Sequence, residues 1–177
     1  ALAAFVLLAT ANGAGYRFGT SDQAAYVPAV VRALNPATFP RDHDLIDTQG
    51  QFFVLDEALA TLSRATGWSV PTVFLVAYLT ALVVIGMGVV AVGRGLLASW
   101  TGTAALLGLV TLRHRIPLTS VNSLEPYFHP RLLAFGLGLL AVAAVRQRRL
   151  ALAVAAVGAA AVCHVTTAVW FAVLVGT

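Results

Sequence analysis

A carboxylate that follows the first apolar run is the most promising chemical group in the chain. Asp22 comes about ten residues after that run. A carboxylate just outside a bilayer can meet both a lipid-anchored donor and a water-side acceptor. It can then take a proton from an acceptor hydroxyl as a general base. Ser21 or Asp22 can instead cap the helix that follows, because Ser and Asp are favoured N-cap residues. The sequence leaves both roles open.

The densest polar cluster consists of Asp42, His43 and Asp44, with Asp47 three residues further on. Two carboxylates beside an imidazole offer oxygen and nitrogen ligands to a divalent ion, so Asp42 and Asp44 are candidate metal ligands. A water-exposed acidic turn produces the same pattern. A divalent metal is therefore possible, and the sequence points to no other cofactor.

A second polar segment combines arginines with histidine and glutamate. Arg113 and Arg115 follow one apolar run, and Glu125, His129 and Arg131 precede the next. Guanidinium groups bind phosphate oxygens in a bidentate manner, so the head group of a polyprenyl phosphate is a natural ligand for this cluster. The same arginines can instead reach outward to ordinary lipid phosphates.

His164 is the ionisable residue in the middle of the last apolar run. Ionisable groups at membrane depth usually face a polar cavity, which makes His164 a candidate for binding substrate. The alternative is structural: a neutral histidine bonded to a backbone carbonyl or to a neighbouring threonine. Next to it, Cys163 is the only cysteine, so no disulfide can form within the chain.

The composition indicates what kind of protein positions these groups. Of the 177 residues, 59% are hydrophobic and 10% are charged, and the mean hydropathy is +0.87. Such values exclude a soluble domain, a disordered tail, a disulfide scaffold and a nucleic-acid module. The net charge of +4 comes from arginines at the ends of apolar runs, which is typical of membrane proteins. We therefore expect an all-α, polytopic membrane helix bundle in a bacterial cytoplasmic (inner) membrane.

The apolar runs give the expected spans. Run lengths near 20 residues are needed to cross a bilayer core of about 30 Å. The chain begins and ends within apolar runs, so we expect a single-domain fragment of a longer polypeptide, with the rest of that polypeptide as a partner. The expected spans are 1–11 (the end of a first helix), 70–92, 95–112, 132–145 and 150–175, the last either one tilted helix or two short helices that meet near His164. The expected close helix contacts are at Gly86, Gly88, Gly136 and Gly138.

Charge orients these spans. Short basic turns containing Arg94, and Arg146, Arg148 and Arg149, should be cytoplasmic by the positive-inside rule. The loop 12–69, which holds six of the seven acidic residues, then lies outside together with the loop 113–131. Asp22 and the arginine cluster would thus face the same compartment.

The outer loop 12–69 should carry two amphipathic helices on the membrane surface. Phe52, Leu55, Leu59 and Leu62 recur at helical spacing, and Gly67 fits a C-terminal cap before an interfacial Trp68. A second helix should begin near Ser21 or Pro28 and end at Asn35-Pro36.

The residues around Asp22 resemble a known pattern. An aspartate soon after the first membrane helix, then an acid and a tyrosine three residues on, is the D-E-x-x-Y pattern of the GT-C glycosyltransferases. The resemblance implies that Asp22 is the catalytic base and that Tyr26 matches the substrate-binding tyrosine, whereas Gln23 stands in place of the acid. The stretch from Cys163 to Thr167 is similar to an H-P-T-T segment of related uncharacterised bacterial membrane proteins, with Val165 in place of the proline.

The resemblance implies a function for this segment. GT-C enzymes transfer a sugar from a polyprenyl-phosphate-linked donor on the non-cytoplasmic face, and here Arg113 and Arg115 would hold the donor phosphate. The alternatives are a membrane transporter or lipid flippase, in which His164 lines the path, and a non-catalytic membrane assembly protein. Binding of nucleic acid is not expected.

Overall fold

A computed structural model of the protein describes residues 1–50, 54–97, 99–112, 114 and 122–176. The described chain is all-helical, as expected. Its helices are α1 (Leu2–Asn12), α2 (Gln23–Leu34), α3 (His43–Gly50), α4 (Leu55–Thr66), α5 (Val70–Leu97), α6 (Trp100–Val110), α7 (Pro130–Arg146), α8 (Leu150–Cys163) and α9 (Val165–Gly176).

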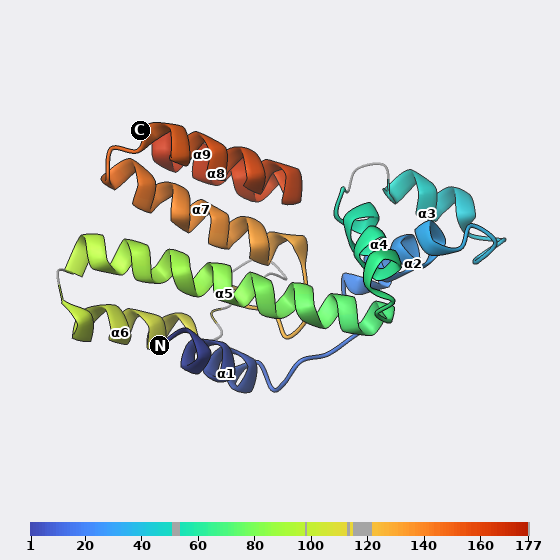
Figure 1. The fold of residues 1–177 in the computed structure, drawn as a ribbon, viewed down its shortest axis with the longest axis horizontal. Coiled ribbons are helices and arrows are strands. Elements are labelled where there is room, and N and C mark those ends of the chain that lie inside the picture. The colour runs from blue at the N-terminus through green and yellow to red at the C-terminus, as the bar shows by residue number, and fades with distance from the viewer. Residues whose placement is uncertain (51–53, 98, 113, 115–121, 177) are drawn as a thin grey trace.

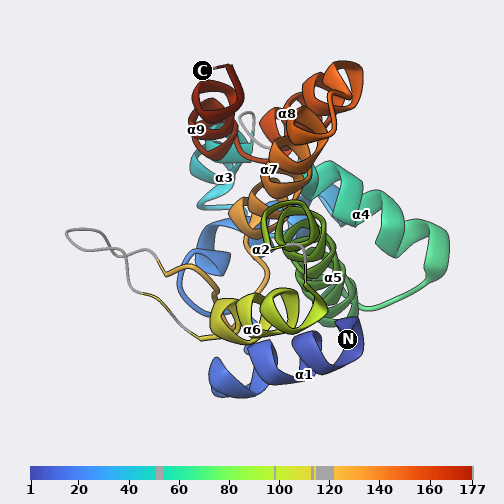
Figure 2. The same ribbon diagram turned by 90° about the vertical axis from the view of Figure 1, so that its left-hand side faces the viewer.

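Helix α5 is the central element of the fold. Helices α1 and α6 lie along one side of it, and α7 packs along the other side and carries α8 and α9 (Figures 1 and 2). The three helices α2, α3 and α4 gather at the N-terminal end of α5. The core is built around Phe74, Tyr78, Leu82 and Ile85 of α5, all of which are almost completely buried.

Among the described residues, α5 is the one helix that is long and apolar enough to cross a membrane. Its first 23 residues carry no charge, as the sequence indicated, but the helix continues to Leu97. The expected turn at Arg94 is therefore wrong: Arg94 is helical, and its guanidinium lies 4.2 Å from the ring centre of Trp100. The next helix, α6, has only 11 residues, where a span over 95–112 was expected.

The last apolar run forms two helices. His164 has an extended backbone (φ −160°, ψ 100°) and separates α8 from α9, so the expectation of one tilted helix is wrong and the alternative of two short helices is confirmed. Helix α9 does not continue in the direction of α8 but folds back beside α7, because His164 contacts His129 at the start of α7 and Phe171 contacts Phe135 further along. Gly176 therefore returns to the end where α7 finishes.

The four glycines in α5 and α7 allow the close contacts that were expected. A Cβ atom added to Gly88 would lie 2.6 Å from the Cβ of Leu139, and one added to Gly136 would lie 2.8 Å from the backbone nitrogen of Ile85. At Gly138 the added atom would lie 2.1 Å from the ring of Phe171, and at Gly86 it would meet Leu2 and Phe5. These contacts hold α1 and α7 against α5, and α9 against α7.

The loop 12–69 contains both helices that were expected. In α4 the apolar residues Leu55, Leu59 and Leu62 face the core, and Gly67 ends the helix with a left-handed conformation (φ 72°). Phe52, the first residue of the predicted stripe, lies outside the described residues. Helix α2 begins directly after Asp22 and ends before Asn35. The short helix α3 was not anticipated, because its acidic sequence suggested a turn.

Candidate functional site

Six of the ten sequence-predicted site residues lie near one another. The loop that follows α1 brings Asp22 to the place where α7 and α9 begin, and Tyr26 in the first turn of α2 lies beside it. His129, Arg131 and Glu125 surround the start of α7. His164 joins them at the start of α9. The sequence separates Asp22 from His129 by more than a hundred residues, so only the packing of α1, α2 and α7 around α5 brings them together.

A hydrogen bond between Asp22 and His129 forms the centre of this cluster. Nε2 of His129 lies 3.2 Å from Oδ2 of Asp22, and Nδ1 of His129 accepts the backbone N–H of Arg131 at 3.0 Å. Because Nδ1 is an acceptor, the ring proton resides on Nε2 and is donated to the carboxylate. The hydroxyl of Tyr127 makes a longer contact of 3.5 Å with the same oxygen. The other oxygen, Oδ1, has no partner among the described residues, and half of the Asp22 side chain is exposed.

His129 is neutral in this arrangement. Burial of the ring, with the nearby positive charge of Arg131 and the ring of His164, lowers the pKa of His129 from 6.5 to about 3. Only 3% of the residue is exposed. The contact with Asp22 is thus a hydrogen bond donated by a neutral ring, and it fixes the orientation of the carboxylate.

The alternative role of Asp22 as a helix cap is not what the structure shows. Asp22 occupies the N-cap position of α2, but its side chain makes no capping hydrogen bond. Its neighbour Gln23 fixes the loop instead: the side-chain carbonyl accepts the N–H of Gly19 at 2.7 Å, and the amide donates to the carbonyl of Phe128 at 3.1 Å. Gln23 is completely buried, a role that the sequence did not reveal.

Glu125 and Arg131 form a second polar pair beside the first. Nη2 of Arg131 lies 3.4 Å from Oε1 of Glu125, which also accepts the backbone N–H of Asn122 at 3.1 Å. The side chain of Glu125 is 4% exposed and that of Arg131 is 21% exposed. Glu125 is therefore held within the protein, while the guanidinium of Arg131 keeps a face open to a ligand.

His164 repeats the capping arrangement of His129. Its Nδ1 lies 2.9 Å from the hydroxyl and 3.3 Å from the backbone nitrogen of Thr167, at the start of α9. The rings of His129 and His164 are 5.6 Å apart, so the N-termini of α7 and α9 are adjacent. The bond to a neighbouring threonine that was one alternative for His164 is present. His164 does not lie in the middle of one helix, because it separates α8 from α9.

A cavity of about 640 Å³ opens beside these two helix starts. We refer to it as the amphiphilic pocket, because one part of its wall is polar and the rest is apolar. The polar part consists of Asn122, Ser123, Arg131, His164, Thr166 and Thr167, and the apolar part of Leu132, Phe135, Trp170, Phe171 and Leu174. The apolar side chains extend along α7 and α9 from the two histidines toward the opposite end of the bundle. Such a wall suits a ligand that has a polar head and a long apolar tail.

The other four predicted residues do not join the cluster. Arg113 and Arg115 lie outside the described residues. Asp42 and Asp44 are exposed on the loop before α3 and at its start; Asp44 contacts His43 at 2.8 Å, and the nearby Asp47 pairs with Arg32 of α2. In the part of the chain that the structure describes, no group of three or more His, Cys, Asp or Glu side chains is placed to hold a metal ion. The metal-ligand role of Asp42 and Asp44 stays a prediction.

Comparison with known proteins adds nothing to the geometry: no family model matches the chain, and neither a curated protein nor a solved structure is significantly similar to it.

Proposed function

We propose that the chain is part of a multi-pass bacterial membrane glycosyltransferase of the GT-C type, which transfers a sugar from a polyprenyl-phosphate donor to an acceptor hydroxyl. The observation that carries the proposal is the Asp22 carboxylate, oriented by neutral His129 beside the amphiphilic pocket. A half-exposed carboxylate with one free oxygen is suited to accept a proton from a hydroxyl group.

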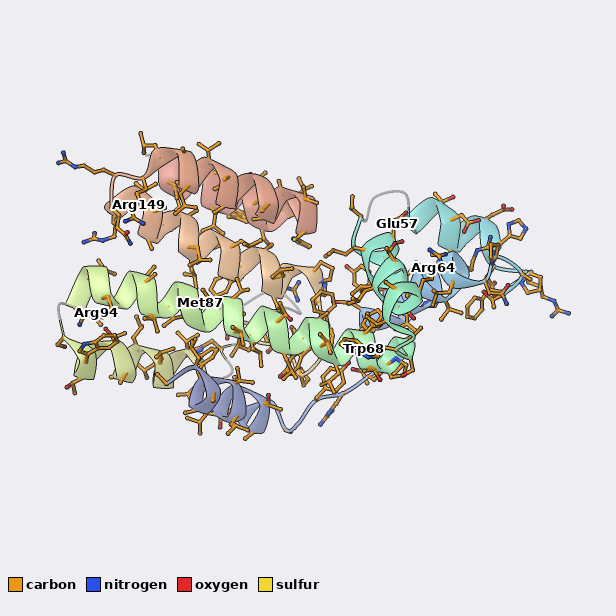
Figure 3. The ribbon with its side chains drawn as sticks, viewed as in Figure 1. Glu57, Arg64, Trp68, Met87, Arg94 and Arg149 are labelled. Atoms are coloured by element: carbon orange, nitrogen blue, oxygen red, sulfur yellow. The ribbon has the colours of Figure 1, made fainter. Side chains whose placement is uncertain are left out.

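The outer surface of the bundle supports the membrane part of the proposal. Large apolar side chains are exposed on α1, α6, α8 and α9, including Leu8, Leu109, Val154 and Trp170. A surface so rich in exposed apolar groups is favourable only against lipid or another protein. Arg94 and Arg149 lie at one end of the bundle and Trp68 at the other (Figure 3). This separation is the arrangement expected of a cytoplasmic and an outer membrane face.

The proposed reaction uses the described residues as follows. The acceptor oxygen forms a bond to the anomeric carbon of the donor, while the bond from that carbon to the phosphate oxygen breaks and leaves its electron pair on the phosphate. The proton of the acceptor hydroxyl moves to Oδ1 of Asp22. Inversion at the anomeric carbon follows from the GT-C resemblance.

The amphiphilic pocket would hold the donor in this reaction. Arg131 and the N-terminus of α9 offer positive charge and N–H groups to the phosphate, while Phe135, Trp170 and Leu174 line the path of the polyprenyl chain. Arg113 and Arg115 are proposed to add to the same phosphate site. Glu125 would act indirectly, by holding Arg131 in place.

The test is sugar transfer by the protein in membranes that contain polyprenyl-phosphate sugar. We expect Asp22→Asn to reduce the rate by about 10²- to 10⁴-fold, because it removes the base and preserves the shape of the side chain. Arg131→Gln should raise the donor KM with a smaller effect on kcat. Glu57→Gln, at an exposed carboxylate of α4, is the matched control and should leave sugar transfer unchanged.

Two results would contradict the proposal. Asp22→Asn could retain full transfer, which would remove the base from the mechanism. Alternatively, no transfer could be found while His164→Ala abolished movement of a lipid or solute across the membrane. That second result would favour the transporter or flippase, in which the break between α8 and α9 belongs to the translocation path.

A further inference from the structure

A second, smaller cavity lies between the end of α1 and the segment before α7. It has a volume of about 290 Å³, and its polar side chains include Asn12, Arg17, Ser21, Asn122, Glu125 and Tyr127. We refer to it as the polar pocket. It differs from the amphiphilic pocket in having side chains that donate and accept hydrogen bonds on several sides. None of the functions considered so far requires it.

The two pockets share a wall. Asn122 lines both of them, and Glu125 of the polar pocket bonds to Arg131 of the amphiphilic pocket at 3.4 Å. Asp22 lies beside this wall: Ser21 precedes it in the chain, and Tyr127, which also lines the polar pocket, contacts its Oδ2. The candidate base is thus next to both cavities.

The chemistry of the polar pocket selects among ligand classes. A divalent cation would find a single carboxylate, that of Glu125, which Arg131 and Asn122 already contact. A simple anion would meet Arg17 but would also face Glu125. A sugar carries hydroxyl groups that both donate and accept, and so it matches amide, guanidinium and carboxylate groups placed around one small space. The volume corresponds to the lower limit of ligand pockets, which fits one sugar ring.

Two further observations indicate that the pocket is more than a packing gap. Arg17 is exposed and its guanidinium has no ion pair or hydrogen bond with the described residues. Ala14 and Ser21 both line the pocket with left-handed backbones (φ 61° and 53°), although neither is glycine. Non-glycine residues in this conformation concentrate at functional sites, because the surrounding structure must hold them there.

We propose that the polar pocket binds a monosaccharide unit, and that this unit belongs to the acceptor whose hydroxyl Asp22 deprotonates. The first part stands on the pocket alone, whereas the assignment to the acceptor rests on the proposed function. The acceptor would therefore be a carbohydrate, approaching from the side of α1, while the lipid-linked donor occupies the opposite side of the Asn122–Glu125 wall.

Direct binding tests the first part. The probes are the methyl glycosides of glucose, galactose and mannose, at millimolar concentration, and the readout is saturation-transfer NMR on the purified full-length protein. We expect at least one glycoside to bind. Arg17→Gln should weaken that binding about tenfold, because it removes a charged hydrogen-bond donor. Arg41→Gln, in an exposed arginine of the loop before α3, is the matched control and should bind normally.

Other results would overturn the inference. It fails if none of the three glycosides binds, or if Arg17→Gln binds as well as the control. It also fails if inorganic phosphate, but no glycoside, protects Arg17 from an arginine-specific reagent, because the pocket is then an anion site.

Further variants test the second part of the proposal, that the bound sugar belongs to the acceptor, and distinguish its failure from failure of the proposed function. Asp22→Asn should bind the glycoside normally and lack transfer. Arg17→Gln should raise the acceptor KM for sugar transfer about tenfold and leave slow hydrolysis of the donor by water unchanged. A wild-type protein that binds glycosides and shows neither transfer nor hydrolysis would overturn the acceptor assignment and the glycosyltransferase together, leaving a saccharide-binding pocket.

Discussion

At the end of the bundle where α7 begins, the charged side chains around His129 are hydrogen-bonded and partly or wholly buried, whereas the arginines at the end where α5 finishes are exposed. Glu125 bonds to Arg131, and Asp22 to the neutral ring of His129. At the opposite end Arg94 stacks on Trp100, and Arg146 donates to the carbonyl of Gly95 at 3.0 Å. None of the four arginines there has an acidic partner among the described residues.

This difference separates two uses of charge. In the proposed membrane protein, exposed arginines would orient the chain without a fixed geometry, because the positive-inside rule depends on their number and location. A buried hydrogen-bonded cluster needs each donor and acceptor in place, since an unpaired buried polar group is costly. The first end should therefore be sensitive to single substitutions and to pH, and the second end should tolerate them.

The largest effect is expected for Gln23→Glu, the change that would restore the acid of the D-E-x-x-Y pattern. An ionised carboxylate cannot donate to the carbonyl of Phe128 and would be buried, so we expect a loss of about 3 to 5 kcal/mol in the free energy of unfolding at pH 7. Thermal or denaturant unfolding of the purified protein measures it.

The control for this prediction is pH. A protonated carboxyl can both donate and accept, so Gln23→Glu should recover much of its stability near pH 5, whereas Gln23→Met should not. If Gln23→Glu has the same free energy of unfolding as the wild type at pH 7, the buried hydrogen bonds at this end contribute less to stability than their geometry indicates.

The second-largest effect that we expect is a pH dependence of the free energy of unfolding, caused by His129. Its pKa is about 3 in the folded protein and 6.5 when unfolded, so the unfolded state binds more protons between these values. The free energy of unfolding should therefore fall as the pH drops below about 6.5, by about 1.4 kcal/mol for each pH unit at most. His129→Asn should be less stable at pH 7 but lack this slope.

Titration of Asp56 in α4 also changes the stability with pH, so its contribution has to be separated from that of His129. Burial, with the adjacent Glu57, raises the pKa of Asp56 from 3.8 to about 7, so its contribution has the opposite sign: stability is present below about pH 4 and is lost as the pH rises to 7. The slope of His129 should therefore be measured in an Asp56→Asn background. A flat profile in that background would contradict the neutral, buried state of His129.

The smallest effect is expected at the arginine end. Arg146→Gln removes one exposed hydrogen bond to Gly95, so the free energy of unfolding should change by less than about 1 kcal/mol. The same unfolding experiment measures it. A loss as large as that of Gln23→Glu would break the contrast between the two ends.

Much of the fold was predictable where one local signal decides the structure. The stripe of Leu55, Leu59 and Leu62 predicted α4, and Gly67 marked its end, because periodicity and capping act within a few residues. The uncharged run from Val70 predicted α5, but not its end, since Arg94 can continue a helix as readily as it can follow one. The fold-back at His164 could not be predicted, because the run around it contains no proline or charge, and a capping histidine resembles an ordinary interruption.

For the candidate site, the sequence indicated residues that belong to it but not which of them contact one another. Asp22, His129 and Arg131 were recognised by residue type and by their positions at the ends of apolar runs. Their pairing was not, because no periodicity connects residues on opposite sides of a long helix. Gln23 and Tyr127 were missed as contributors, because burial of a glutamine and the reach of a tyrosine to Asp22 follow from tertiary packing alone.

The two hydrogen bonds of His129 also limit how protons travel through the molecule. One ring nitrogen gives its hydrogen to Asp22, and the other is occupied by the backbone of Arg131. A ring with both nitrogens occupied cannot pass a proton onward, so no proton relay leads from Asp22 through His129 into the bundle. The half of the Asp22 side chain that faces out instead lets a gained proton return to the surrounding water before the carboxylate acts again.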